Sequence, residues 1–348
     1  MGSFSHYIIR RVFLIAPTLF CVMIVNFMII HCAPGGPVES MMAQMSVEDL
    51  SVGVQSGDGV AKTLEEQIGD DLRKKYGLDR PLFERFCIMV KNYVVFDFGK
   101  SYFKNQPVAD LILKGGAISF SIGVWTVLLI YVASIPLGIA KAVRNGSKFD
   151  LYSSLIVVAG YALPNFLLAM VLVVLFAGGG FWSWFPVEGL RSDNYEELSF
   201  ISRVTDYFWH IAIPVFSEVA TSLAAITMLT KNAFLDEMGK QYVVTARAQG
   251  LSERSVLIGH VMRNALLLIV ARVPLTLVTV FFSSSILIER MFSLNGLGML
   301  GFEAVSNRDY PIIFATLYVF TLFGLALRLV SDIVYAAADP RIRFETQR

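Results

Sequence analysis

The chain has 348 residues, of which 55% are hydrophobic and only 16% are charged, and its mean hydropathy is +0.61. Because soluble domains carry about 25% charged residues, this composition excludes an ordinary soluble protein and indicates an integral membrane protein. The net charge of +1 gives no basis for expecting nucleic acid as a partner.

Six apolar segments are long enough to cross the hydrocarbon core of a bilayer, which takes about 20 residues. They cover residues 7–31, 117–140, 151–180, 211–230, 265–288 and 312–334. Arg10 and Arg11 lie at the start of the first segment and precede a charge-free run, as in a signal peptide, but this run is long: residues 12–38 contain no Lys, Arg, Asp or Glu. That stretch is too long for a signal peptide, so we expect a retained first helix.

The spans divide the chain into four parts. We expect a first transmembrane helix over residues 1–31, an outer helical loop or cap over 32–115, a five-helix transmembrane core over 116–334 and a C-terminal tail over 335–348. The core includes a cytoplasmic loop over residues 232–262.

The orientation follows from Lys and Arg in the short loops. Basic residues gather near the N-terminus, in the 141–150 turn, in the 231–263 loop and near the C-terminus, so we place all four in the cytoplasm. The shorter loops on the opposite, outer side of the membrane contain both basic and acidic residues. We expect Glu289 to lie in one of these outer loops.

The long outer loop has helix signals of its own. Thr63 and Glu66 form a capping box, and Gly77 ends the helix that follows. Pro81 opens a second helix with an apolar stripe. Two interpretations stay open: a cap that packs on the spans, or a docking surface for a solute-binding partner.

Among the charged residues of the predicted spans, Arg10, Arg11, Arg328 and Asp332 lie near span ends. Glu218 and Arg272 lie deeper, where a charge costs about 2.5–3.5 kcal/mol on insertion scales. Glu218 and Arg272 are therefore candidates for the lining of a substrate path, Glu218 for an amino group and Arg272 for a carboxylate. Their predicted depths differ by roughly 13 Å at 1.5 Å per residue, so they are not expected to pair. Histidines lie singly at the span ends, and no metal site is expected.

The stretch over residues 242–251 contains small and polar residues between two apolar spans. Arg247 offers a planar fork of donors, and Gly250 can adopt positive φ and end a helix. Ser252 can cap the next helix, with Glu253 in its first turn. The pattern predicts helix, glycine break and helix, which is either a rigid docking element or an ordinary amphipathic connection.

This stretch, continued through residues 252–254 and 263–265, resembles the cytoplasmic "EAA" coupling loop of ABC importer permeases of the dipeptide and oligopeptide class. Outer-loop motifs at 76–82 and 97–101, and further motifs at 291–298, 307–311 and 339–343, resemble the same family. One departure is that the motif usually begins Glu-Ala-Ala, where this chain has Thr245-Ala246-Arg247. The resemblance assigns ATPase coupling to Tyr242, Thr245, Ala246, Arg247, Ala248, Gly250, Leu251, Ser252 and Glu253.

The resemblance implies an all-α, six-helix permease of the type I importer kind in the bacterial inner membrane. Such a chain is not an enzyme and holds no cofactor, because its ATPase partner binds ATP and Mg²⁺. It implies a second, homologous permease in a heterodimer, a periplasmic solute-binding protein and import of oligopeptides or peptide-like compounds of the microcin C type.

Two other function classes were weighed against this one. An ion-coupled secondary transporter of small peptides is the main alternative, but the sequence shows no internal repeat of the kind such transporters use. A membrane-embedded hydrolase would need a motif such as H-E-x-x-H or G-x-S-x-G, and the sequence has neither.

Overall fold

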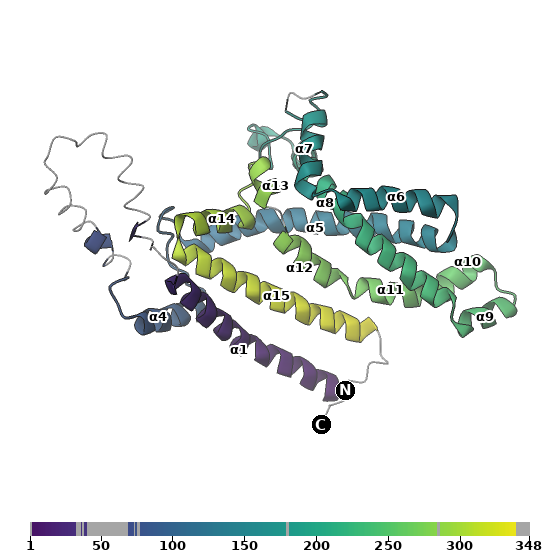
Figure 1. Ribbon diagram of the computed structural model, residues 1–348, viewed down its shortest axis with the longest axis horizontal. Coiled ribbons are helices and arrows are strands. Elements are labelled where there is room, and N and C mark those ends of the chain that lie inside the picture. The colour runs from purple at the N-terminus through teal and green to yellow at the C-terminus, as the bar shows by residue number, and fades with distance from the viewer. Residues whose placement is uncertain are drawn as a thin grey trace. The chain divides into compact units, whose positions relative to one another are not determined.

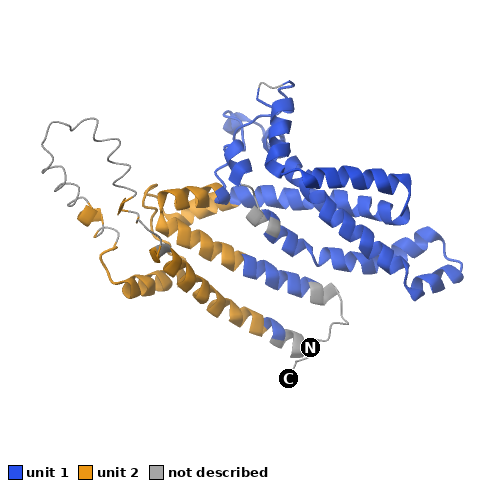
Figure 2. Cartoon of the chain, viewed as in Figure 1, with its two compact units in different colours: residues 1–8, 117–298, 324–348 blue, residues 9–116, 299–323 orange. Residues whose placement is uncertain are grey.

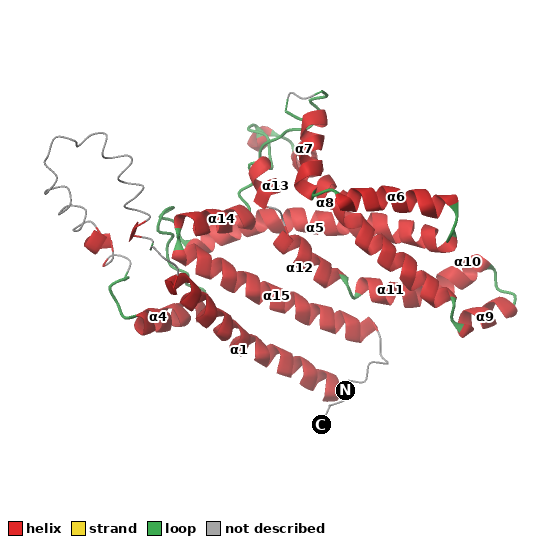
Figure 3. Ribbon diagram, viewed as in Figure 1, coloured by secondary structure: helices red, strands yellow, loops and turns green. Residues whose placement is uncertain are grey.

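The structure is a computed structural model that describes residues 2–32, 36, 38–39, 69–72, 74, 77–178, 181–283 and 286–338. These residues are almost entirely helical, and their only β-pairing is two isolated bridges (Figures 1 and 3). Five helices are long and apolar enough to cross a membrane, and a bent helix pair adds a sixth crossing if it counts as one span. The prediction of an all-α membrane protein with up to six spans is therefore confirmed.

The helices in chain order are α1 (Gly2–Cys32), α4 (Leu82–Val94), α5 (Val108–Val143), α6 (Lys148–Ala162), α7 (Asn165–Phe176), η1 (Tyr195–Glu197), α8 (Phe200–Met238), α9 (Gln241–Ala248), α10 (Glu253–Val256), η2 (Leu257–Val261), α11 (Met262–Val270), α12 (Val273–Ser283), α13 (Ile286–Met291), α14 (Leu297–Asn307) and α15 (Tyr310–Ala338). Helices α5 and α8 have 36 and 39 residues and extend past both ends of their predicted spans. At about 1.5 Å per residue they exceed a hydrocarbon core of roughly 30 Å, so their ends project beyond it.

The third predicted span is not one straight helix. It consists of α6 and α7, which meet at an angle of 98°. Leu163 has extended backbone angles, with φ −87° and ψ 131°, and Pro164 follows it. A proline disfavours the helical conformation in the residue before it and cannot donate a backbone hydrogen bond, which explains why α6 ends at this point.

The fifth predicted span, over residues 265–288, overlaps an apolar helical run that could cross the membrane. This run is Glu253–Val278, and it contains a break at residues 271–272. Pro274, in the first turn of α12, lacks the N–H that would continue the ladder across this break. Ser331 of α15 donates from its hydroxyl to the Ala271 carbonyl at 3.1 Å, which satisfies a carbonyl beside the break.

A wide π-helical turn, η2, joins α10 to α11. The buried residues Val256 and Val261 are five positions apart across this turn, whereas Val261, Ala265 and Ile269 follow at four-residue spacing. A π-turn closes i to i+5 hydrogen bonds, so the extra residue keeps all four side chains on the face that packs into the core.

Two compact units divide the described residues (Figure 2). Unit 1 comprises residues 1–8, 117–298 and 324–348, and unit 2 comprises residues 9–116 and 299–323. In unit 1, α8 crosses α5 and α6 closely at small residues. A Cβ on Gly138 would lie 2.5 Å from the Thr230 Cβ, and one on Gly160 would lie 2.8 Å from the Ala220 carbonyl oxygen. These glycines therefore permit the close crossings.

Unit 2 is held together by aromatic contacts among α1, α4 and the start of α15. The Phe27 ring lies 5.3 Å from that of Phe86 and 5.9 Å from that of Phe314, between ring centroids. Helix α4 begins directly after Pro81, as predicted, and Gly77 has a φ of +64°. The capping box predicted at residues 63–66 lies outside the described residues.

Candidate coupling site

The predicted coupling stretch forms two short helices, α9 and α10, separated by a tight turn. Gly250 has a φ of +81°, and its N–H donates to the Arg247 carbonyl at 2.9 Å. Ser252 accepts from the Ser255 N–H at 3.3 Å and so caps α10. The predicted sequence of helix, glycine break and capped helix is confirmed.

One face of this pair of helices belongs to the main core cluster of unit 1. Val243 and Ala246 of α9 and Val256 of α10 are buried together with Phe234 of α8 and Ile269 of α11. The two helices therefore form a firmly packed element, which we call the knuckle. Ala246 packs inward, so it supports the outer surface of the knuckle and does not form part of it.

The other predicted coupling residues face outward. The exposed set is Tyr242, Thr245, Arg247, Ala248, Gly250, Leu251, Ser252 and Glu253. A Cβ on Gly250 would meet no atom within 4 Å. The knuckle thus presents a contiguous small and polar surface on a buried apolar base.

Arg247 does not leave its guanidinium fork open, as the sequence analysis expected. Its Nε and Nη2 donate to the two carboxylate oxygens of Glu253 at 2.9 Å and 3.1 Å. Both side chains are exposed, so this bidentate pair contributes no more than about 1 kcal/mol. It does, however, fix the orientation of Arg247 and joins α9 to α10 across the turn.

Tyr242 ties the base of the knuckle to its neighbours. Its hydroxyl donates to Glu237 of α8 at 2.6 Å and accepts from the Asn264 amide of α11 at 3.1 Å. Partial burial and the hydrogen bond to Glu237 raise the pKa of the Tyr242 phenol. The hydrogen bond to Glu237 also raises the pKa of Lys240, so both groups keep their protons and their contacts at neutral pH.

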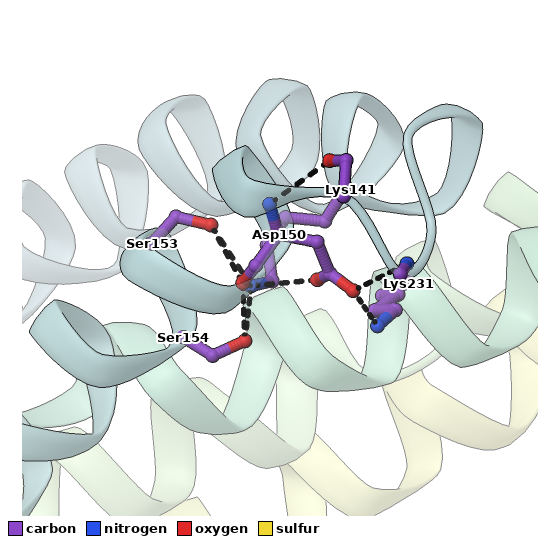
Figure 4. A network of polar contacts seen from close by, with 7 residues as sticks. Lys141, Asp150, Ser153, Ser154 and Lys231 are labelled. Atoms are coloured by element: carbon purple, nitrogen blue, oxygen red, sulfur yellow. Dashed lines mark hydrogen bonds and ion pairs between the residues drawn. The ribbon is translucent and has the colours of Figure 1, made fainter.

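A polar network, which we call the Lys–Asp–Lys clamp, joins α5, α6 and α8 (Figure 4). Asp150 pairs with Lys141 at 3.1 Å and with Lys231 at 2.7 Å. The completely buried Lys141 ammonium also donates to the Asp150 carbonyl at 3.0 Å and to the hydroxyls of Ser153, at 3.0 Å, and Ser154, at 2.6 Å. In the sequence, Lys141 is one of several basic residues in the 141–150 turn, and nothing in that pattern predicts this network.

The two candidate substrate-path residues lie in different elements, one in α8 and one between α11 and α12. Glu218 of α8 is 6% exposed and accepts from the Thr126 hydroxyl of α5 at 3.3 Å. Arg272 is exposed in the turn between α11 and α12. No hydrogen bond or ion pair joins the two residues within the described part of the chain, which agrees with the prediction that they do not pair.

Glu289 is a second buried carboxylate, although the sequence analysis assigned it to a loop. It lies in α13, is 1% exposed and accepts from the Ser119 hydroxyl at 2.9 Å. The same Ser119 oxygen accepts from the Leu297 N–H at 2.9 Å. A Cβ on Gly296 would collide with the Glu289 carboxylate, so glycine is needed where the chain turns from α13 into α14.

Comparison with known proteins places this architecture in a family. Residues 134–344, which include every predicted coupling residue, match the family described as "Binding-protein-dependent transport system inner membrane component". The chain belongs to this family. It is a multi-pass inner-membrane permease subunit of an ABC transporter and is not an enzyme.

Three relatives align over nearly the whole chain. The "Inner membrane ABC transporter permease protein YejB" of Escherichia coli O157:H7 is 47% identical over 97% of this chain and 99% of its own length. The "Peptidoglycan transport system permease protein YejB" of Agrobacterium fabrum is 47% identical over 97% and 98%. The "Oligopeptide transport system permease protein AppB" of Bacillus subtilis is 31% identical over 98% and 100%.

These relatives confirm the resemblance that the motifs indicate. Residues 229–237 and 33–38 point, within the family, to the YejB branch, and the two YejB relatives confirm this too. Membership of an ABC permease family decides against the alternative of an ion-coupled secondary transporter.

Proposed function

We propose that this chain forms half of the translocation pathway of an ATP-driven importer for oligopeptides and peptide-like compounds, including those of the microcin C type. The support comes from relatives whose names refer to oligopeptide, glutathione and peptidoglycan transport. The compounds in these names all contain peptide bonds. Because this chain aligns with the three permeases over nearly its whole length, we infer that it is a subunit of a peptide importer.

The proposed complex contains four kinds of partner. A sister permease pairs with this chain as a heterodimer, ABC ATPase subunits bind ATP and Mg²⁺, a periplasmic solute-binding protein delivers the peptide, and lipid surrounds the spans. In this complex the ATPases change shape on nucleotide binding, and the permease alternates between two global states.

The knuckle is the proposed docking point for an ATPase subunit. The observation that supports this proposal is that the knuckle has one buried face and one exposed face. Val243 and Val256 are 0% and 1% exposed, while the residues of the opposite face are exposed. A partner that pushes on the outer face therefore pushes on α8 and α11 through buried side chains, because a packed core transmits displacement with little compression.

Exchange of Gly250 for valine tests this docking. A β-branched residue at φ +81° is strained, and its side chain would project from the outward face of the knuckle. We expect the Gly250→Val complex to reach the membrane and retain the sister permease, but to lose ATPase subunits or the stimulation of ATP hydrolysis by the binding protein. The measurement is the ATPase-to-permease ratio in the purified complex, together with stimulated hydrolysis and peptide uptake.

Gly99→Val is the matched control, because Gly99 has a φ of +71° and also has no atom within 4 Å of an added Cβ. It imposes similar backbone strain far along the chain from the knuckle. Wild-type ratios and rates in Gly250→Val, or equal losses in both variants, would show that the knuckle is an ordinary connection.

Glu218 and Arg272 stay the proposed contacts to substrate. Glu218 is sheltered beside Thr126, so we propose that it meets a peptide's amino group only after the Thr126 hydroxyl releases it. Glu218→Gln should lower peptide uptake without changing assembly, because the amide keeps the shape and removes the charge. Unchanged uptake across several peptides, with Thr126→Val as the packing control, would assign Glu218 a packing role only.

A further inference from the structure

A cavity of about 610 Å³ lies within unit 2, where α4 meets the end of α1 and the start of α15. This volume falls in the range of about 300–1,000 Å³ that is typical of ligand sites. Aromatic rings form one wall: Phe27 stacks on Phe314 at 5.9 Å, and His31 lies 5.9 Å from Tyr310. The coupling function proposed above makes no use of this cavity.

The charged groups that line the cavity are mostly basic. Arg80, Arg85 and Lys100 contribute cations, and Asp97 contributes one carboxylate, which accepts from the Gly99 N–H at 3.0 Å. Arg80 is bound to Glu84 at 3.2 Å. The lining therefore favours an anion.

Arg85 is the central cation of this lining. It is half-buried, and among the described residues its guanidinium makes no hydrogen bond or ion pair. Burial lowers the pKa of this guanidinium, as happens when a cation leaves water without a compensating charge. An anionic ligand would supply that charge and would accept hydrogen bonds from the planar fork of donors.

The helices that form the cavity also carry exposed apolar side chains. Ile88 of α4 lines the cavity and is 37% exposed, and outside the lining Met28 and Ile29 of α1 and Phe83 of α4 are 61%, 62% and 79% exposed. Helix α4 has only 13 residues, too few to span a bilayer, but it carries exposed apolar side chains next to charged ones. These are the features of a helix that lies in the membrane interface. On the predicted topology, the end of α1 reaches the outer interface.

We propose that this cavity binds the head group of an anionic phospholipid. Its phosphate lies between Arg85 and Lys100, and its acyl chains follow the exposed apolar faces of α1 and α4. The basic lining accounts for the negative head group, and the exposed apolar side chains of α1 and α4 account for a ligand with long apolar chains. A soluble phosphate or the carboxylate of a peptide would bind to the basic lining but would make no use of the exposed apolar side chains.

The test titrates lipid into the detergent-purified importer complex and counts bound molecules by native mass spectrometry. Its arms are dioleoyl phosphatidylglycerol, dioleoyl phosphatidylcholine and glycerol 3-phosphate, which separate the charge of the head group from the apolar chains. We expect phosphatidylglycerol to bind at least about tenfold more tightly than either of the others, because the phosphatidylcholine head group has no net charge and glycerol 3-phosphate has no acyl chains.

Arg85→Gln should weaken phosphatidylglycerol binding about tenfold, and Arg85→Lys should retain most of it. Lys91→Gln is the matched control, because Lys91 is an exposed cation of the same helix that does not line the cavity. If Arg85→Gln impairs assembly, Lys100→Gln provides the second test of the site. Equal binding of phosphatidylcholine, equal binding of glycerol 3-phosphate, or equal behaviour of the Arg85→Gln and Lys91→Gln variants would overturn the proposal.

Discussion

At the scale of single residues, the Lys–Asp–Lys clamp shows how a charge can be stabilised inside an apolar helix bundle. The ammonium of Lys141 is completely buried but has four oxygen partners from the first two turns of α6. Lys231, which shares Asp150 with it, is 14% exposed at its side chain. The two lysines therefore have different surroundings although both pair with the same carboxylate.

This difference predicts unequal effects on stability. Lys141→Met leaves Asp150 short of one buried partner and should destabilise the permease by about 3 to 5 kcal/mol, whereas Lys231→Met should cost less because water can replace part of its contact. The measurement is the thermal unfolding midpoint of the purified complex. Lys148→Met, at an exposed lysine of the same turn, is the control and should leave the midpoint unchanged. Equal midpoints for the Lys141 and Lys148 variants would contradict this account.

The Arg247–Glu253 pair gives a second prediction. Arg247→Glu places two carboxylates side by side and should lower stimulated ATP hydrolysis, because the turn between α9 and α10 loses its bidentate link. The double exchange Arg247→Glu with Glu253→Arg rebuilds an opposite-charge pair and should restore most of that activity. Stimulated hydrolysis that stays low in the double variant would instead show that a partner reads the charge of Arg247 itself.

At the scale of elements, close helix crossings decide which helices can move together. Helix α8 approaches α5 and α6 at glycines, and the clamp joins the same three helices. The knuckle continues from α8 and shares its core. These contacts make α5, α6 and α8 one mechanical group that receives any force applied to the knuckle.

Gly138→Ala tests this group. The added methyl would lie 2.8 Å from the Thr227 carbonyl oxygen and 2.5 Å from the Thr230 Cβ, so the helices must separate at a cost of about 1–3 kcal/mol. The unfolding midpoint should fall accordingly. Gly301→Ala is the control, since Gly301 is also helical and an added Cβ meets nothing within 4 Å. That change should be neutral or slightly stabilising, and a matching fall in both variants would refute the crowding argument.

At the scale of the whole molecule, the charge distribution along the chain predicts which loops face the cytoplasm. Single cysteines introduced at Lys148 and Ser252 should react with an impermeant reagent only after the cytoplasmic face is opened, and one at Asp193 should react from outside. All three positions are exposed, so burial cannot mask the result. The native Cys21, Cys32 and Cys87 are also exposed and must first be replaced. Labelling at Ser252 in intact cells would reverse the predicted orientation.

Local rules predicted much of the structure from the sequence, and long-range contacts account for the rest. Gly250 and Ser252 act through their own backbone and near neighbours, so their conformations could be predicted. Asp150 and Lys231 are 81 positions apart, and no pattern in a single sequence indicates that they meet. Pro164 can be located in the third span from the sequence, but the 98° bend depends on how α7 packs against α8.

The π-turn η2 has a consequence for how this loop can change in length. Val256 and Val261 both reach the core only because one extra residue is accommodated between them. Deletion of one residue from this turn would leave a four-residue spacing, which an ordinary α-helix also places on one face. The knuckle should therefore tolerate the loss of a residue here better than the gain of one, because a chain one residue shorter at this point keeps the outward face of α9 and α10 in the same phase relative to α11.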